Sequence, residues 1–199
     1  MLLFLGLSAL VIVVPGQDTA LTIRNTLLGE RRGGVATATG VATGQTLWTA
    51  ATAFGIGALL AASEPAFEAL RLAGAAYLVW LGARALYAAL RRASPARSGE
   101  RVARTPRAAF RQGLLSNLGN PKMLAFFTSL LPQFSASSGG LLAHGLIFCS
   151  LTFAWLALYA LAVSRVRGFL DRGRVRRALD AIIGVVLVSF GARLAAEHR

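Results

Sequence analysis

The sequence is poor in the residues that build disulfide frameworks, metal sites and hydrolytic active sites. It contains one cysteine, Cys149, inside an apolar stretch, and two histidines, His144 and His198, neither with a partner at a metal-ligand spacing. A disulfide framework or a zinc site needs several such residues at regular spacings. A hydrolytic site needs a nucleophile with a base, or a motif such as HExxH. We therefore expect no metal, no cofactor and no catalytic residues, which argues against an enzyme.

Acidic residues are also scarce. There are eight of them against 21 basic residues, which gives a net charge of +13. Charged residues make up 15% of the chain, whereas soluble domains average about 25%. The hydrophobic fraction is 55% and the mean hydropathy is +0.60. This composition argues against a soluble fold.

Long apolar stretches predict an all-α membrane protein with one transmembrane domain over residues 1–199. Six stretches approach or exceed the roughly 20 apolar residues needed to cross a bilayer. The first has neither a basic n-region nor a small-residue cleavage site, so we interpret it as a retained span rather than a signal peptide. The spans are predicted at about 1–25, 34–62, 67–90, 110–132, 140–164 and 178–196.

Basic residues predict how these spans are oriented. Two, seven and six of them lie in or beside the loops after the first, third and fifth spans, whereas the other two loops carry only Arg71. Because cytoplasmic loops are enriched in Lys and Arg, both termini are predicted to lie outside. The basic clusters lack a run of aromatic side chains on which bases would stack, so we do not expect nucleic-acid binding.

The two halves of the chain resemble each other. A proline, a glycine 24 or 25 residues later, a tryptophan and a Gly-Ala-Arg triplet recur in the same order. A polar, arginine-rich linker at about 93–107 separates repeat 1 (about 1–92) from repeat 2 (about 108–199). Because each repeat has three spans, the second must be inverted relative to the first, as in many secondary transporters. The matched residues are Pro15, Gly40, Trp48 and Gly82-Ala83-Arg84 in repeat 1, and Pro121, Gly145, Trp155 and Gly191-Ala192-Arg193 in repeat 2.

The two prolines predict broken helices in the first and fourth spans. Pro15 and Pro121 each fall near the middle of their span, and Asn120 before Pro121 has the pattern of an N-cap. The first amides of a helix lack partners and carry a partial positive charge, so two N-termini that meet at mid-depth predict a carboxylate site. The prolines could also be simple kinks satisfied by neighbouring helices, but their equivalent placement favours a site.

Each break is followed by an ionisable residue, Asp18 after the first and Lys122 after the second. A charge at mid-membrane costs at least about 2.5–3.5 kcal/mol, so both side chains must face the interior or find a partner. We expect Asp18 to bind a substrate ammonium group or to exchange a proton. We expect Lys122 to bind a carboxylate or to balance Asp18. The alternative is a structural ion pair between the two.

Weaker candidates lie near the breaks. Asn117 is equally consistent with lining a cavity and with bonding a neighbouring backbone, and Gln45 is slightly more consistent with helix packing than with a ligand role. Gly40 and Gly44 have the GxxxG spacing that lets helices approach closely, either within one chain or in a homodimer.

Four segments resemble the LysE/RhtB family of amino-acid exporters: PGQD at 15–18, LAGAAYLVWLGARAL at 72–86, FRQGLLSNLGNPKMLAFFTSLLPQF at 110–134 and ALDAIIGVVLVSFGARLA at 178–195. The resemblance implies a secondary-active exporter or antiporter in the bacterial inner membrane. Amino acids such as lysine, homoserine, threonine or leucine, or close derivatives, would leave the cytoplasm by alternating access, driven by the proton gradient or the membrane potential. The expected partners are an amino acid and membrane lipid. A channel, or an exporter of another small solute, is the alternative.

Two positions bear on the substrate. Gln17 stands where the family usually has a second proline, and Gln45 stands where a carboxylate or amide commonly follows a glycine, so lysine specifically is not indicated. The family motif maps onto Pro15, Gly16, Asp18, Gly40, Gly44, Asn120, Pro121 and Lys122. The full predicted substrate-binding set is Pro15, Gly16, Gln17, Asp18, Gly40, Gly44, Gln45, Asn117, Asn120, Pro121 and Lys122, with Asp18 also the candidate for proton coupling.

Overall fold

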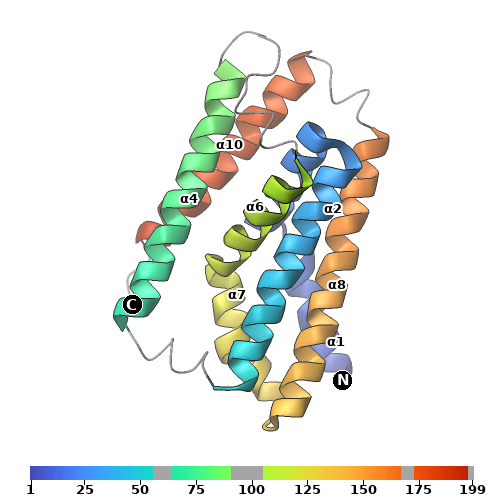
Figure 1. Ribbon diagram of the computed structural model, residues 1–199, viewed down its shortest axis with the longest axis vertical. Coiled ribbons are helices and arrows are strands. Elements are labelled where there is room, and N and C mark those ends of the chain that lie inside the picture. The colour runs from blue at the N-terminus through green and yellow to red at the C-terminus, as the bar shows by residue number, and fades with distance from the viewer. Residues whose placement is uncertain (56–63, 91–104, 167–172, 197–199) are drawn as a thin grey trace.

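The computed structural model describes residues 1–55, 64–90, 105–166 and 173–196, and all regular structure in these ranges is helical (Figure 1). This confirms the predicted all-α class. Most of the predicted linker at 93–107 lies outside the described residues. The long helices are α1 (Leu2–Val13), α2 (Gln17–Ala53), α4 (Glu64–Leu90), α6 (Pro106–Leu118), α8 (Ser138–Arg165) and α10 (Gly173–Ala196). Between α6 and α8 lie α7 (Pro121–Ala125), the π-helix η1 (Phe126–Leu130) and the 3-10 helix η2 (Leu131–Phe134).

Length and composition identify the most apolar helices. Among the described residues, α8 alone is long and apolar enough to cross a membrane, and α1 and α2 qualify together as a pair bent by 54°. A shorter apolar stretch, Ala181–Phe190, lies inside α10. The helices thus fit a membrane protein, with apolar spans clearest in the first and fifth predicted segments.

The first predicted break is present. Helix α1 ends at Val13, and α2 begins at Gln17 after an extended Gly16 at its N-cap. Pro15 lies in this connection, where its missing N–H leaves a carbonyl of α1 without a helical donor. The break therefore falls inside the first predicted span, as expected.

Helix α2 contains a reversal that separates the first two predicted spans. Gly29 and Glu30 have non-helical backbone angles, and Glu30 has φ 59°. Residues 17–28 and 31–53 pack against each other, since Asn25 Nδ2 donates to Thr37 Oγ1 at 2.9 Å. A Cβ on Gly33 would collide with the carbonyl oxygen of Asn25, so glycine permits this close return of the chain.

The second predicted break separates α6 from α7. Helix α6 begins at Pro106 and ends at Leu118, and the side chain of Thr105 caps its N-terminus by accepting a hydrogen bond from the Ala108 amide. Asn120 then caps α7, its side chain accepting a hydrogen bond from the Lys122 amide, and Pro121 takes the first helical position. This confirms the predicted N-cap and proline.

Close helix contacts hold the bundle together. Helix α2 packs on α6 and on α8, whereas α4 packs on α10 to form a pair beside the other helices (Figure 1). A Cβ on Gly40 would collide with the Phe110 carbonyl of α6, and one on Gly82 would lie 2.8 Å from the Gly184 carbonyl of α10. The GxxxG pair of α2 therefore serves packing within one chain.

Candidate functional site

Asp18 lies where the two broken helices meet. It is buried in the first turn of α2 and accepts three hydrogen bonds from residues around the second break. Ser116 Oγ donates to Oδ1 at 2.9 Å, while Asn117 Nδ2 and Asn120 Nδ2 donate to Oδ2 at 3.0 and 3.2 Å. Gln17 Nε2 also donates to the Ser116 carbonyl oxygen at 2.6 Å. The end of α6 and the cap of α7 thus hold the start of α2.

The surroundings of Asp18 suit an ionised carboxylate. An ionised carboxylate only accepts hydrogen bonds, whereas a protonated one must also donate one. The two asparagine amides are oriented as donors and the serine hydroxyl donates as well. The N-terminal end of α2 adds a partial positive charge. These donors replace part of the water that a buried anion would lose.

Lys122 binds the end of α1 rather than the carboxylate of Asp18. Its Nζ donates to the carbonyl oxygens of Val11 at 3.0 Å and Val14 at 3.3 Å. Among the described residues, Lys122 and Asp18 form no direct ion pair, although each lies within electrostatic reach of the other. Instead of the structural ion pair that was one alternative from the sequence, the Lys122 ammonium binds carbonyl oxygens at the C-terminal end of α1.

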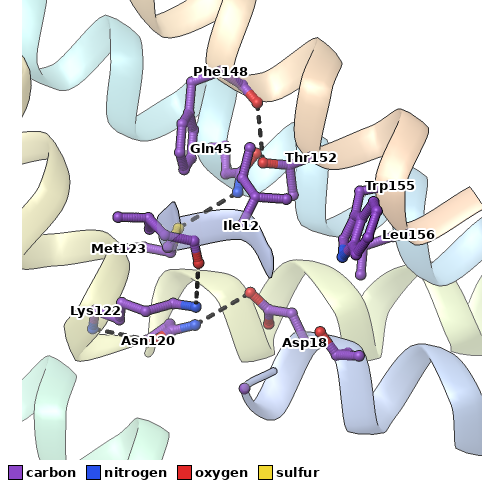
Figure 2. A pocket seen from close by; sticks show the side chains of 13 residues that line it. Ile12, Asp18, Gln45, Asn120, Lys122, Met123, Phe148, Thr152, Trp155 and Leu156 are labelled. Atoms are coloured by element: carbon purple, nitrogen blue, oxygen red, sulfur yellow. Dashed lines mark hydrogen bonds between the residues drawn. The ribbon is translucent and has the colours of Figure 1, made fainter. Parts of the chain in front are cut away.

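A small cavity opens between these groups. Its volume is about 20 Å³, roughly that of one water molecule. In Figure 2, Asp18, Asn120 and Lys122 lie on one side of it, and Phe148, Gln45 and Thr152 on the other. An amino acid does not fit in this volume, so binding requires the surrounding helices to move apart. The lining residues are Val11, Ile12, Gly16, Asp18, Thr19, Gln45, Asn120, Lys122, Met123, Phe148, Thr152, Trp155 and Leu156.

Two polar atoms on the cavity wall have no partner among the described residues. Gln45 is 1% exposed, and its Oε1 accepts no hydrogen bond while its Nε2 donates to Met123 Sδ at 3.4 Å. The indole N–H of Trp155 is likewise buried without an acceptor. Buried polar groups are normally paired, so a free acceptor and a free donor beside one cavity indicate a place for a polar ligand.

The predicted residues fall into two groups. Those on the cavity wall are Gly16, Asp18, Gln45, Asn120 and Lys122. The others support the wall: Asn117 and Gln17 join the two breaks, Pro15 and Pro121 lie at the breaks, and Gly40 and Gly44 lie against α6. A Cβ on Gly44 would lie 2.8 Å from Asn117 Oδ1, so this glycine makes room for the amide that binds Asp18.

Sequence reasoning missed several members of the site. Ser116 is neither charged nor marked by a periodic pattern, and only its position directly before Asn117, close to the second break, could have suggested it. Trp155 was noted as a repeat marker and not as a cavity residue. Helix α8 carries it one turn from Thr152, and the packing of α8 on α2 brings both to the cavity.

Comparisons with known proteins give a matching family and several full-length relatives. The LysE type translocator family matches residues 9–198. The homoserine/homoserine lactone efflux protein of Salmonella typhimurium is 31% identical, over 98% of this chain and 95% of the relative. The leucine efflux protein of Salmonella choleraesuis is 29% identical, over 93% of this chain and 89% of the relative. The uncharacterized membrane protein YrhP of Bacillus subtilis is 27% identical, over 97% of each chain. No solved structure is significantly similar.

The family match covers nearly the whole chain, and these relatives align over almost their full lengths. The relatives with named activities are efflux proteins. The chain is therefore a membrane transport protein and not an enzyme, and it belongs to the LysE type translocator family.

Proposed function

We propose that this protein exports neutral amino acids, or close derivatives, from the cytoplasm by secondary active transport. The observation that carries the proposal is the buried carboxylate of Asp18, held by three donors beside a cavity at the junction of two broken helices. Homoserine, its lactone and leucine, the substrates in the names of two relatives, each carry an α-amino group that such a carboxylate could bind.

The substrate ammonium would bind Asp18, with the unpaired Gln45 Oε1 as a second acceptor. The substrate carboxylate would bind the first amides of α2, which have no partners inside the helix. Of the two roles that the sequence left open for Asp18, the donor set favours ammonium binding over proton exchange. Proton exchange at Asp18 is the competing assignment, and substitutions of Lys122 distinguish the two.

The cavity wall suits a neutral side chain. Ile12, Met123, Phe148 and Leu156 give it an apolar surface, and Asp18 is the one acidic residue among its lining residues. A second ammonium group, as in lysine, would have no carboxylate there to pair with. Burying an unpaired charge is expensive, so lysine should be a poor substrate.

Transport would follow alternating access across six spans in two inverted repeats. The described elements support this, since a broken helix, a long helix and a third helix follow each other twice along the chain. The distribution of basic residues supports an inner-membrane protein with both termini outside.

The proposal is tested by efflux from cells that overproduce the protein. Cells loaded with dipeptides hydrolyse them and accumulate amino acids, whose release is measured with and without a protonophore. We expect faster release of neutral amino acids such as leucine or homoserine than of lysine. No increase in release of any amino acid or derivative would refute the proposal, and release independent of any driving force would favour a channel.

A further inference from the structure

The end of α1 is a site for a cation. The last carbonyls of a helix lack helical donors and carry a partial negative charge. Val11 and Val14 contribute two such oxygens at the first break, and Gly16 lies beside them, because a Cβ there would be 3.5 Å from Lys122 Nζ. In secondary transporters with broken helices, freed carbonyls of this kind coordinate the coupling ion.

In this chain the site is filled by a side chain. The Lys122 ammonium donates hydrogen bonds to both carbonyl oxygens, and Lys122 belongs to the other repeat, more than a hundred residues away. It is the single lysine among 21 basic residues, in a chain that otherwise uses arginine. Lysine can lose its proton when buried, whereas arginine stays charged in proteins.

We propose that Lys122 is a tethered coupling cation: its ammonium takes the place of a sodium ion on the α1 carbonyls, and its proton is the one exchanged for substrate. The proposal rests on the exporter function above and deepens it by naming the coupling group. It assigns Asp18 to the substrate and Lys122 to the proton.

The charges around Lys122 support this division. Asp18 from α2 is the one other ionisable group on the described cavity wall. Helix α1 faces Lys122 with neutral carbonyls, and α8 contributes the uncharged Thr152 and Trp155 to the same wall. A substrate ammonium that reaches Asp18 places a second positive charge near Lys122. This repulsion favours loss of the lysine proton when substrate binds.

The exchange balances in protons and charge. In the state open to the cytoplasm, substrate binds and the Lys122 ammonium releases one proton to the cytoplasm. In the state open to the outside, substrate leaves and the neutral amine takes up one proton from outside. One proton enters for each zwitterionic amino acid that leaves, and no sodium ion is required.

Proteoliposomes with a labelled neutral amino acid test the proposal. For the wild-type protein we expect transport driven by a pH gradient and unaffected by replacing sodium with potassium. Lys122→Arg keeps a cation on the α1 carbonyls but cannot release a proton. Because substrate binds with loss of this proton, Lys122→Arg should lose both the exchange of labelled for unlabelled substrate and the stimulation by the pH gradient. Lys122→Met resembles the neutral amine of the substrate-bound state, so it should retain the exchange of labelled for unlabelled substrate while losing stimulation by the pH gradient.

The controls separate the possible failures. Arg107→Met removes an exposed cation at the start of α6 and should leave every readout unchanged. Gradient-driven transport by Lys122→Arg at the wild-type rate, or a sodium requirement in the wild-type protein, would overturn the coupling role. Absence of amino-acid transport by folded wild-type protein would instead overturn the exporter function itself.

Discussion

At the scale of single residues, the site is a set of partners arranged around one carboxylate. Asp18 has three donors, and the free atoms on the cavity wall belong to Gln45 and Trp155. Paired groups fix the geometry of the carboxylate, whereas unpaired groups are positioned for a ligand. Substitutions of the two kinds should therefore affect stability and transport differently.

Replacing Asp18 with Asn should stop transport without preventing membrane insertion. The substitution keeps the size of the side chain but removes the charge that binds a substrate ammonium. Hydrogen bonds to charged groups contribute about 1.5–3 kcal/mol, so substrate affinity should fall roughly 10- to 150-fold. Ser116→Ala removes one neutral donor and should weaken binding roughly fivefold, about 1 kcal/mol. Substrate binding to the purified variants measures both effects, and full efflux by Asp18→Asn would remove Asp18 from the mechanism.

Replacing Trp155 with Phe should reduce transport but not stability. The indole N–H of Trp155 has no acceptor among the described residues, so removing it breaks no hydrogen bond. It also removes the cost of burying an unpaired donor, about 1–3 kcal/mol in the free energy of folding. Trp48→Phe is the matched control, because the Trp48 N–H is equally buried without a partner but does not line the cavity. Melting temperatures of both variants should equal or exceed that of the wild type. Only Trp155→Phe should lower the efflux rate, and equal loss in both variants would contradict a ligand role.

At the scale of elements, glycines set how closely the helices approach. Gly40 and Gly113 lie at the contact of α2 with α6, where a Cβ on Gly113 would collide with the Thr37 carbonyl. One turn further along the same contact, Gly44 makes room for Asn117, whose amide donates to Asp18, so helix packing and site geometry depend on one interface.

Gly40→Ala should therefore destabilise the protein. Its Cβ would collide with the backbone of α6, and overpacking of this kind costs about 1–3 kcal/mol. Gly6→Ala is the control, since no atom lies within 4 Å of its Cβ position on α1. We expect a lower melting temperature in detergent for Gly40→Ala alone. Equal stability of the two variants would show that α2 and α6 do not pack this closely.

Local signals predicted the elements better than the contacts between them. Pro15, Pro121 and Asn120 act on their own neighbours, so both breaks and the α7 cap were foreseeable from the sequence. The bonds to Asp18 join residues about a hundred positions apart, and no local pattern encodes them. Lys122 was expected to bind a carboxylate or to balance Asp18. Instead it binds the freed carbonyls of α1, which compete for an ammonium group once the helix is broken.

At the scale of the whole molecule, the orientation of the chain in the membrane determines how its two repeats are related, because it fixes whether each half crosses the membrane an odd or an even number of times. If both termini lie outside and the central linker at 93–107 lies inside, each half must cross the membrane an odd number of times. Two halves that each cross an odd number of times run in opposite directions. Inversion of the repeats then follows from topology alone, whatever the similarity of their sequences.

Reporter fusions test this topology. Because basic residues concentrate in alternate loops, alkaline phosphatase fused after residue 199 should be active, and the same enzyme fused within the linker should be inactive. Green fluorescent protein at the two positions should give the opposite pattern, since it folds in the cytoplasm. A fluorescent C-terminal fusion would place the C-terminus inside and leave one half with an even number of spans. The two breaks could then not be related by inversion of the repeats.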